Sequence, residues 1–368
     1  MKYYVITGEA SGDIHGANLV HEIKKIDKSA EIRAWGGSNL KKEGASIVKD
    51  INEMSFMGFI EVLFGLNKIL KLLKLCKNDI INFNPDVIIL VDYPGFNLRI
   101  AKFAKKQNFK VVYYISPQIW AWHRSRIHNI KKYVDLMIPI LPFEKEFYKK
   151  YDINVKYFGH PLIDELVKYK NKNTVSESEK HIALLPGSRK SEISKMLPVF
   201  CETAKMFPNE KFVVASMSIH TVTYYENLLK DKPDNLIVKF DETYNILANA
   251  KAALVTSGTA TLETAIFNVP QVVCYKTNYT SYLVARIVAK VKYISLVNLI
   301  LNRQLIVELI QKNCNKSFIS VELKKLLNDI DYRNVILAGY KELAEKLKNE
   351  GASKSVATEI VNFTTVNK

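Results

Sequence analysis

Short apolar runs alternate with longer amphipathic stretches along almost the whole chain. The apolar runs are rich in Val and Ile without strict alternation, which is typical of parallel strands covered on both faces. The stretches between them are long enough for helices, so the pattern predicts right-handed strand–helix–strand units and an α/β fold class. The predicted strands span residues 3–7, 31–35, 87–91 and 111–115 in the first half and 182–185, 211–215, 236–239, 252–256 and 271–275 in the second.

A polar segment at residues 168–180 interrupts this pattern near the middle of the chain. It is almost without large apolar side chains, so it predicts a linker. We expect one Rossmann-like domain over 1–167, a second over 181–345 and a C-terminal helix over 346–368, with a break at Gly351. Ligands of open parallel sheets bind at the carboxyl ends of the strands, and we expect both sheets to present that edge to a shared interdomain cleft.

Two strand-to-helix turns in the second half have the pattern of phosphate-binding loops. In the first, a buried run ends at Gly187-Ser188-Arg189, and in the second another ends at Ser257-Gly258-Thr259. Such turns leave backbone N–H groups unpaired at a helix N-terminus, where they can hold an anion. With Arg189 on one turn and Glu263 beyond the other, the pair predicts a nucleotide diphosphate site. Two α/β domains with nucleotide loops in the second are the plan of GT-B glycosyltransferases.

A Gly-rich turn over residues 7–16 follows the first predicted strand and does not match the dinucleotide pattern G-x-G-x-x-G. Two interpretations stay open. Asp13 caps the helix that follows, or the turn is a second anion site on the acceptor side of the cleft. The second interpretation would involve Ser11, Gly12, Asp13 and His15.

Asp92 comes directly after the buried run 87–91, before a Pro-Gly turn and Asn97. A carboxylate at the end of such a strand can lie near a substrate hydroxyl. Attack by that hydroxyl on an anomeric carbon needs a base to accept its proton, and a positioned Asp is suited to this. The alternative is that Asp92 only caps its own turn.

Residues 113–126 combine aromatic and basic side chains after another predicted strand. Trp120 and the arginines Arg124 and Arg126 could stack on a sugar or contact phosphate. The alternative is a buried tryptophan with solvated basic neighbours. The nearby histidines, His123 and His128, lack a metal-ligand context.

Residues 59–77 form a basic amphipathic segment. Its apolar stripe at helical spacing suits a core helix, but Phe64, Leu72 and Leu75 fall outside the stripe and leave surplus apolar surface. A cationic helix of this kind can dock on an anionic bilayer or bind acyl chains, which is the interpretation we favour. The residues expected to face membrane or acyl chains are Val62, Leu63, Leu66, Ile69, Leu70 and Leu73.

The chain carries 53 Lys and Arg against 37 Asp and Glu, a formal charge of +16. This excess fits either a Lys-rich proteome or an anionic partner. Nucleic acid is not expected, because the basic residues are spread along the sequence and no recognition module is visible. Four scattered cysteines indicate a reducing compartment. The chain opens on a predicted strand and has no apolar run of ~18 residues, so we expect neither a cleaved leader nor a spanning helix.

Eight motifs appear in an order that resembles the lipid-A-disaccharide synthase family over nearly the whole length. They are SGDIHG (11–16), MGFIE (57–61), DYPGFN (92–97), SPQIWAW (116–122), PFE (142–144), GHP (159–161), LPGSR (185–189) and SGTATLE (257–263). Generic GT-B enzymes share the last of these motifs but not the motifs of the first half.

The resemblance implies an inverting GT-B enzyme that needs no metal or other cofactor. It implies transfer from UDP-2,3-diacylglucosamine to 2,3-diacylglucosamine 1-phosphate (lipid X), with a β-1,6 linkage and release of UDP. The reaction would take place at the cytoplasmic face of the inner membrane, with the enzyme bound peripherally. The sequence does not decide between a monomer and a homodimer.

Roles carried over from the family attach to motif residues. Asp92 matches the general base. The expected UDP-binding residues are Gly187, Ser188, Arg189, Ser257, Gly258, Thr259, Glu263, Asn298, Gln304 and Glu308. The expected acceptor-side residues are Ser11, Gly12, Asp13, His15, Glu61, Asn97, Trp120 and Arg124.

Other classes of enzyme fit the sequence less well. Another UDP-sugar GT-B enzyme, such as the peptidoglycan N-acetylglucosaminyltransferase or a 2-epimerase, would not need the 116–122 motif or the 59–77 segment. An NAD-dependent dehydrogenase would need G-x-G-x-x-G. The one Asp-x-Asp triplet, Asp329 to Asp331, lies in a polar helical stretch and is interpreted as solvated surface rather than a metal site.

Overall fold

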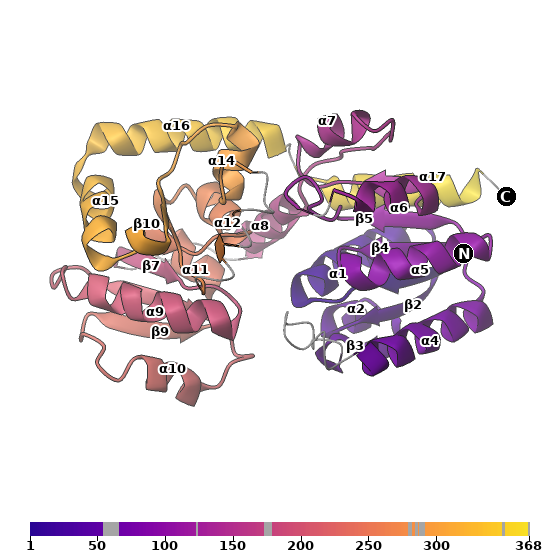
Figure 1. Ribbon diagram of the computed structural model, residues 1–368, viewed down its shortest axis with the longest axis horizontal. Coiled ribbons are helices and arrows are strands. Elements are labelled where there is room, and N and C mark those ends of the chain that lie inside the picture. Colours follow the sequence, from indigo (N-terminus) through magenta and orange to yellow (C-terminus); the bar gives the residue numbers. More distant parts are fainter. Residues whose placement is uncertain are drawn as a thin grey trace. The chain divides into compact units, whose positions relative to one another are not determined.

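The computed structural model describes residues 1–53, 66–122, 124–172, 179–278, 282–283, 286, 291–347 and 350–366. The chain divides into two compact units, Met1–Asp164 with Lys348–Lys368, and Glu165–Leu347. Each unit contains a six-stranded parallel sheet with helices packed against it, and Figure 1 labels many of the elements of both. The predicted α/β class with two parallel sheets is therefore confirmed.

The sheet of the first unit has the strand order β3-β2-β1-β4-β5-β6. Its strands are β1 (Lys2–Ile6), β2 (Glu31–Gly36), β3 (Ser46–Asp50), β4 (Val87–Val91), β5 (Val111–Tyr114) and β6 (Leu136–Ile138). Its helices are α1 (Ala10–Ile26), α2 (Ser38–Lys42), the 3₁₀ helix η1 (Ile51–Glu53), α4 (Leu66–Phe83), α5 (Pro94–Lys106), α6 (Arg126–Tyr133), α7 (Glu144–Lys149) and α17 (Ala352–Thr365).

The sheet of the second unit has the order β12-β11-β10-β7-β8-β9, which is the same topology in its own numbering. Its strands are β7 (His181–Leu185), β8 (Phe212–Ser216), β9 (Leu236–Phe240), β10 (Ala250–Val255), β11 (Gln271–Tyr275) and β12 (Glu308–Ile310). Its helices are α9 (Lys190–Ala204), α10 (Val222–Leu228), α11 (Thr243–Ala248), α12 (Ala260–Ile266), α14 (Leu296–Leu301), η2 (Gln311–Asn313), α15 (Lys316–Asn328) and α16 (Ile330–Leu347).

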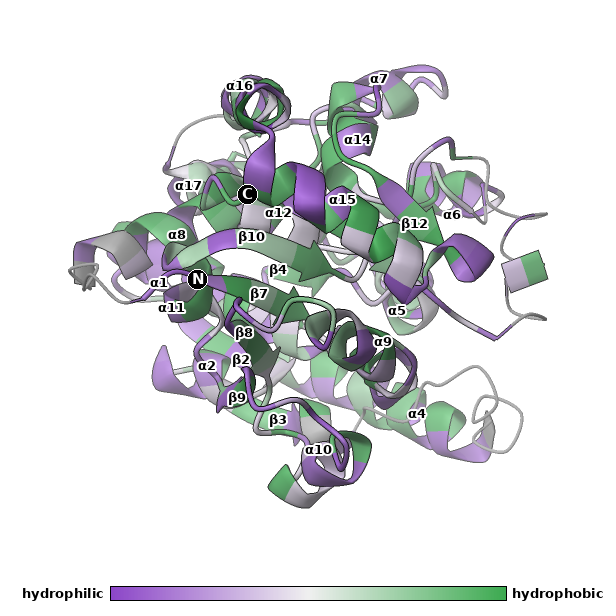
Figure 2. Ribbon diagram, turned by 90° about the vertical axis from the view of Figure 1, so that its left-hand side faces the viewer, coloured by the Kyte–Doolittle hydropathy of each residue, from purple (hydrophilic) through white to green (hydrophobic). Residues whose placement is uncertain are grey.

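The interior strands are largely apolar because both faces of each sheet are covered. In β1, Tyr3 and Val5 belong to one buried cluster while Tyr4 and Ile6 belong to the cluster on the opposite face. A strand whose side chains are buried on both faces of the sheet has no polar face, so polar and apolar residues do not alternate along it. In Figure 2 the arrow of β10 is green along most of its length, in line with its buried end at Val255.

The C-terminal helix α17 belongs to the first unit. Its residues Val356, Ala357 and Ile360 join the cluster that includes Tyr3 and Val5. Its N-terminal end is held by Asp164, whose two carboxylate oxygens accept the N–H groups of Gly351 at 2.6 Å and Ser353 at 2.8 Å. Gly351 has a φ of 96°, as expected for the break predicted there.

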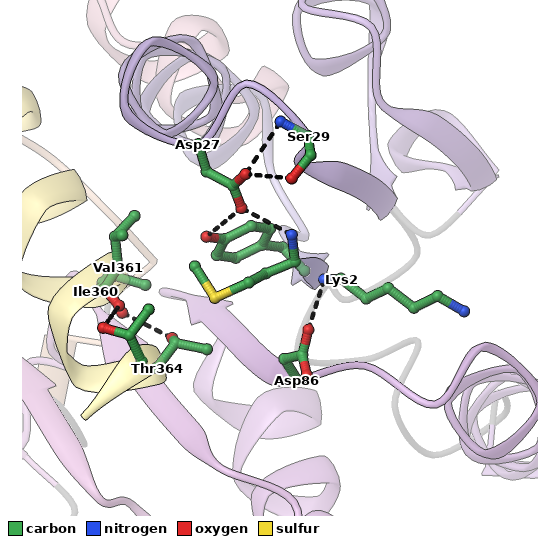
Figure 3. Close-up of polar contacts among 10 residues, drawn as sticks. Lys2, Asp27, Ser29, Asp86, Ile360, Val361 and Thr364 are labelled. Atoms are coloured by element: carbon green, nitrogen blue, oxygen red, sulfur yellow. Dashed lines mark hydrogen bonds and ion pairs between the residues drawn. The ribbon is translucent and has the colours of Figure 1, made fainter. Parts of the chain in front are cut away.

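The start of β1 is fixed by two carboxylates at the other end of this core (Figure 3). The N-terminal amino group of Met1 donates to Asp27 at 2.8 Å, and the N–H of Lys2 donates to Asp86 at 2.8 Å. Thr364 of α17 lies in the same region.

The predicted linker at 168–180 overlaps helix α8 (Pro161–Lys172), so its residues 168–172 are helical. Lys and Tyr in this stretch are compatible with a helix, and a polar sequence alone does not end one. Residues 173–178 lie outside the described residues.

Candidate functional site

In each unit, two of the motif loops flank the point where the strand order reverses. In the first unit the loops after β1 and β4 flank this point, and in the second unit the loops after β7 and β10 do so. Open parallel sheets bind ligands at such points. The two predicted anion turns thus lie on neighbouring strands, and so do the Gly-rich turn and Asp92.

The turn 186–189 leads from β7 into α9 and is closed by an internal carboxylate. Gly187 has a φ of 105°, which only glycine adopts readily. Glu192 accepts the N–H groups of Ser188 at 3.2 Å and Arg189 at 3.4 Å. Its other oxygen lies 3.5 Å from the Arg189 guanidinium. A carboxylate of the protein itself thus lies against this helix N-terminus. Binding of a diphosphate at the turn stays a prediction.

The turn 256–259 leads from β10 into α12. Gly258 has a φ of 120°, and a Cβ placed on it would meet no atom within 4 Å, so its α-carbon faces open space. Thr259 is exposed, whereas the hydroxyl of Ser257 donates to the Ile294 carbonyl at 2.9 Å. Gly258 and Thr259 can therefore approach a ligand through their backbone, while the Ser257 side chain fastens the turn to the segment before α14.

Three expected UDP-binding residues, Asn298, Gln304 and Glu308, come from the segment around α14 and β12, and two of them bond the protein backbone. Asn298 is fully buried, and its amide bonds the carbonyl of Ile306 and the N–H of Leu305 and Ile306. Glu308 accepts the N–H groups of Ile294 at 2.9 Å and Ser295 at 3.0 Å. The exposed side chain among the three is Gln304, which precedes the two loop residues that Asn298 bonds.

Glu263 lies in the first turn of α12 and is half-buried. Burial, together with the charges of Glu263 and Glu165, holds the pKa of Tyr244 above its ordinary value. Glu263 therefore has a protein neighbour in Tyr244, and contact with a ribose stays a prediction.

Asp92 is held in a left-handed backbone conformation at the end of β4. Asp92 and Tyr93 have φ values of 47° and 52°, which are uncommon for residues other than glycine. The carbonyl of Asp92 accepts the Tyr113 hydroxyl at 2.6 Å and the Asn97 amide at 2.8 Å. Strain that surrounding bonds maintain in this way is typical of functional positions. Burial, followed by the Asp92 charge, raises the pKa of Tyr113.

Asn97 was expected on the acceptor side but is fully buried. Its amide also donates to the Val91 carbonyl at 3.3 Å, so it fixes the end of β4. Asn97 therefore orients Asp92 rather than touching an acceptor.

The Gly-rich turn differs from the capping interpretation, while an anion site on the acceptor side stays a prediction. Asp13 is buried inside α1 and accepts the N–H groups of Gly37 at 2.6 Å and Asn39 at 3.0 Å, so it caps α2 rather than its own helix. A Cβ on Gly8 would come within 2.1 Å of the Tyr93 ring, which covers the turn. Ser11 is exposed, Gly12 is buried and His15 is half-buried.

His15 lies beside His160, which sequence reasoning did not single out. Burial, and then the charge of His15, lowers the pKa of His160 to about 3. The imidazole of His160 is therefore neutral, and its Nδ1 accepts the Leu162 N–H at 3.2 Å.

Trp120 is buried and Arg124 is exposed, which matches the alternative interpretation of this motif. The indole N–H of Trp120 donates to Glu144 at 3.1 Å. Glu144 is fully enclosed, and burial raises its pKa to about 7 although Leu141 donates an N–H to it. Glu144 thus links the loop after β5, which carries Trp120, to the loop after β6, which carries Leu141. The sequence does not reveal this role.

The prediction that the α4 stripe faces lipid is wrong for Leu73 and Ile69. Leu73 is 6% exposed, and Ile69 and Leu72 pack against the same core. Leu70 is 60% exposed and Leu75 is 46% exposed, so the free apolar surface lies on the flanks of the helix. The periodicity correctly predicted a helix, but we expected Ile69 and Leu73, which pack on the core, to face the membrane. Glu61, Val62, Leu63 and the side chain of Leu66 lie outside the described residues.

Within the part of the chain that the structure describes, no three His, Cys, Asp or Glu side chains gather as a metal site. Asp329 and Asp331 are both exposed, and Asp329 accepts the Tyr332 N–H at 2.9 Å, so the prediction of a solvated surface is confirmed. No helix among the described residues is long and apolar enough to cross a membrane.

Comparison with known proteins places these features in a family. The family model described as Lipid-A-disaccharide synthetase matches residues 3–361. The lipid-A-disaccharide synthase of Syntrophus aciditrophicus (strain SB) is 37% identical over 364 residues, which cover 96% of this chain and 95% of that protein.

Solved structures show the fold. The UDP-GlcNAc 2-epimerase of Neisseria meningitidis bound to UDP-GlcNAc aligns with a TM-score of 0.71 at 13% identity, over 98% of this chain and all of that one. The glycotransferase of kitacinnamycin aligns with a TM-score of 0.66 at 11% identity, over 99% of this chain and 98% of the other. At such identities the likeness establishes a GT-B fold alone. The family match goes further, and the chain belongs to the lipid-A-disaccharide synthase family of glycosyltransferases.

Proposed function

We propose that the protein transfers 2,3-diacylglucosamine from its UDP derivative to the 6-hydroxyl of 2,3-diacylglucosamine 1-phosphate. The product is a β-1,6-linked disaccharide 1-phosphate, and UDP is released. The observation that carries this proposal is the family match over residues 3–361, together with motif loops at the reversal point of each sheet.

In the proposed reaction the second unit binds UDP. The diphosphate lies against the turns 186–189 and 256–259, where backbone N–H groups and the Arg189 guanidinium oppose its charge. Glu192 has to give up its bonds to Ser188 and Arg189 when the diphosphate arrives. As the glycosidic bond to UDP breaks, the leaving oxygen gains charge, and the same groups stabilise it. We therefore propose a reaction without a metal, for which activity in excess EDTA is the test.

Asp92 acts as the general base in this proposal. The acceptor oxygen attacks the anomeric carbon as the bond to UDP breaks, its proton passes to the Asp92 carboxylate, and UDP leaves with the electron pair. A single displacement inverts the anomeric carbon and needs one base, so a second catalytic carboxylate is not required. The bonds that Tyr113 and Asn97 make to the Asp92 backbone support this role by fixing where the carboxylate starts.

The protein binds the cytoplasmic face of the inner membrane peripherally in this proposal. Helix α4 supports it, since the exposed Leu70 and Leu75 lie on the same helix as the exposed Lys68, Lys71 and Lys74. Apolar side chains flanked by lysines suit an interface with anionic lipid.

Replacing Leu70 by Ser is expected to weaken binding to phosphatidylglycerol vesicles without lowering the melting temperature, because Leu70 is largely exposed already. Leu73→Ser is expected instead to destabilise the fold by about 2–5 kcal/mol, because Leu73 is in the core. Val335→Ser on α16, where Val335 is 61% exposed, is the matched control and should change neither property. Vesicle sedimentation measures membrane binding, and thermal melts measure stability. Unchanged sedimentation of Leu70→Ser would show that the exposed side of α4 does not bind the membrane.

The experiment that tests the function offers the purified protein one donor at a time with different acceptors. UDP-2,3-diacylglucosamine with lipid X should release UDP and yield a disaccharide 1-phosphate by mass spectrometry. UDP-GlcNAc with lipid I, the acceptor of the peptidoglycan N-acetylglucosaminyltransferase, should release no UDP, and UDP-GlcNAc alone should not be epimerised. Turnover in either of the last two reactions, with none in the first, would assign the protein to another activity.

A further inference from the structure

Arg126 is a half-buried cation next to the Asp92 loop. It is the first residue of α6, the helix that follows the loop after β5. Its guanidinium carbon lies 6.0 Å from the centre of the Trp122 ring, which covers one side of it. No carboxylate among the residues that the structure describes forms an ion pair with Arg126. Holding a guanidinium partly out of water without a counter-charge is unfavourable.

A second guanidinium, that of Arg99, makes it still less favourable to hold the Arg126 charge partly out of water. Helix α5, which carries Arg99, packs against α6. Burial, and then the charge of Arg99, lowers the pKa of Arg126, whereas the Tyr113 hydroxyl acts in the opposite direction. Arg99 is exposed and donates to the Gly95 carbonyl of its own helix, so its charge is not neutralised there. Two neighbouring guanidinium groups with no carboxylate partner among the described residues indicate an anion-binding position.

Arg126 lies at the same edge of the sheet as Asp92, the proposed general base. Strands β4 and β5 are neighbours, so the Asp92 loop and the loop leading to Arg126 leave the sheet at the same edge. Tyr113 links the two: its hydroxyl donates to the Asp92 carbonyl at 2.6 Å, and the charge of Arg126 partly offsets the rise in the Tyr113 pKa that burial and Asp92 cause. The anion would therefore bind close to the general base.

We propose that Arg126, with Arg99 beside it, binds the phosphate group of the acceptor and so selects a phosphorylated sugar lipid. This inference rests on the proposed function. A phosphate monoester carries more than one negative charge and offers oxygens that match the fork of a guanidinium. Arg124 is the arginine that the sequence pattern suggested, but it is exposed and bears no comparable electrostatic cost.

The test compares Arg126→Ala with Arg124→Ala on two acceptors, lipid X and the same molecule without its phosphate. Arg126→Ala should lower kcat/KM for lipid X by about 10- to 100-fold, as expected for loss of a charge-assisted contact. The same variant should leave kcat/KM for the dephosphorylated acceptor unchanged, so the preference for phosphate disappears. Arg124→Ala should retain that preference. Arg126→Lys should restore part of it, because it keeps the charge but not the fork.

The other possible results each point to a different role for Arg126. Equal losses on both acceptors would mean that Arg126 supports the fold or the base, and would overturn the proposal. Arg126→Ala could instead bind phosphatidylglycerol vesicles less well and keep its preference for lipid X. That result would mean that Arg126 and Arg99 bind a membrane lipid, and it would also overturn the proposal. Absence of product with the unaltered protein would refute the proposed function itself. Normal vesicle binding of Arg126→Ala, with the preference lost, supports the proposal.

Discussion

Replacing Asp92 by Asn is expected to lower turnover by about 10²- to 10⁴-fold, the usual contribution of a positioned general base. UDP affinity should stay unchanged, because the proposed diphosphate site lies in the other unit. The substitution suits this position, since Asn tolerates the left-handed backbone that Asp92 adopts at a φ of 47°. The bonds from Tyr113 and Asn97 go to the backbone carbonyl of residue 92 and survive the change.

Turnover should be measured at saturating donor and acceptor, with UDP affinity measured separately by calorimetry. Tyr113→Phe is the matched control, because it removes the 2.6 Å bond to the Asp92 carbonyl and retains the carboxylate. Its loss of turnover should be much smaller than that of Asp92→Asn. Near-normal turnover of Asp92→Asn would eliminate Asp92 as the base.

Arg189→Ala is expected to weaken UDP binding by about 1.5–3 kcal/mol, which corresponds to about 10- to 150-fold in Kd. The side chain is 67% exposed, so its removal leaves no cavity. The turn itself should persist, because Glu192 still accepts the N–H of Ser188 at 3.2 Å. The melting temperature of the variant should therefore match that of the unaltered protein, while calorimetry reports the weaker binding.

Glu192→Gln is the informative partner of this substitution. Gln keeps an oxygen that can accept the N–H groups of Ser188 and Arg189, but it removes the negative charge from the turn. UDP should bind more tightly to this variant than to the unaltered protein, because the diphosphate no longer competes with a carboxylate. Unchanged affinity in both Arg189→Ala and Glu192→Gln would place the diphosphate elsewhere.

The sequence predicted the interior of each sheet and missed strands at the edges. All nine predicted strands are present, with β4 and β11 at the predicted residues. The missed strands, β3, β6 and β12, are each the outermost strand of a sheet. Edge strands can be short and partly solvated, so they lack the long apolar run that identifies an interior strand. The three residues of β12, for example, include the polar Glu308.

Loop positions were easier to predict than side-chain roles. A Gly-rich turn after a buried strand locates the carboxyl edge of a sheet, and that local signal placed Gly187, Gly258 and Asp92 correctly at the reversal points. A polar residue in such a loop has the same sequence signal whether it touches a ligand or supports the backbone. Asp13 bonds Gly37, a partner 24 residues away that no local pattern reveals.

Helix α4 illustrates the same limit for apolar residues. Helical spacing correctly indicated a helix, but Ile69, Leu70 and Leu73 lie within about 100° of one another on a helical wheel. Only the packing of the helix on the sheet decides which flank is covered. In the structure Leu73 is buried and Leu70 is exposed. Composition could not have distinguished them, because both are leucine.

The proposed mechanism requires that UDP binds the second unit, between the turns after β7 and β10, while the base belongs to the first unit. Hydrogen–deuterium exchange with and without UDP tests it most directly. We expect slower exchange at the amides of Ser188, Arg189, Gly258 and Thr259 when UDP is bound. Protection confined to residues 8–13 and 92–97, with no change at 187–189 and 258–259, would contradict it.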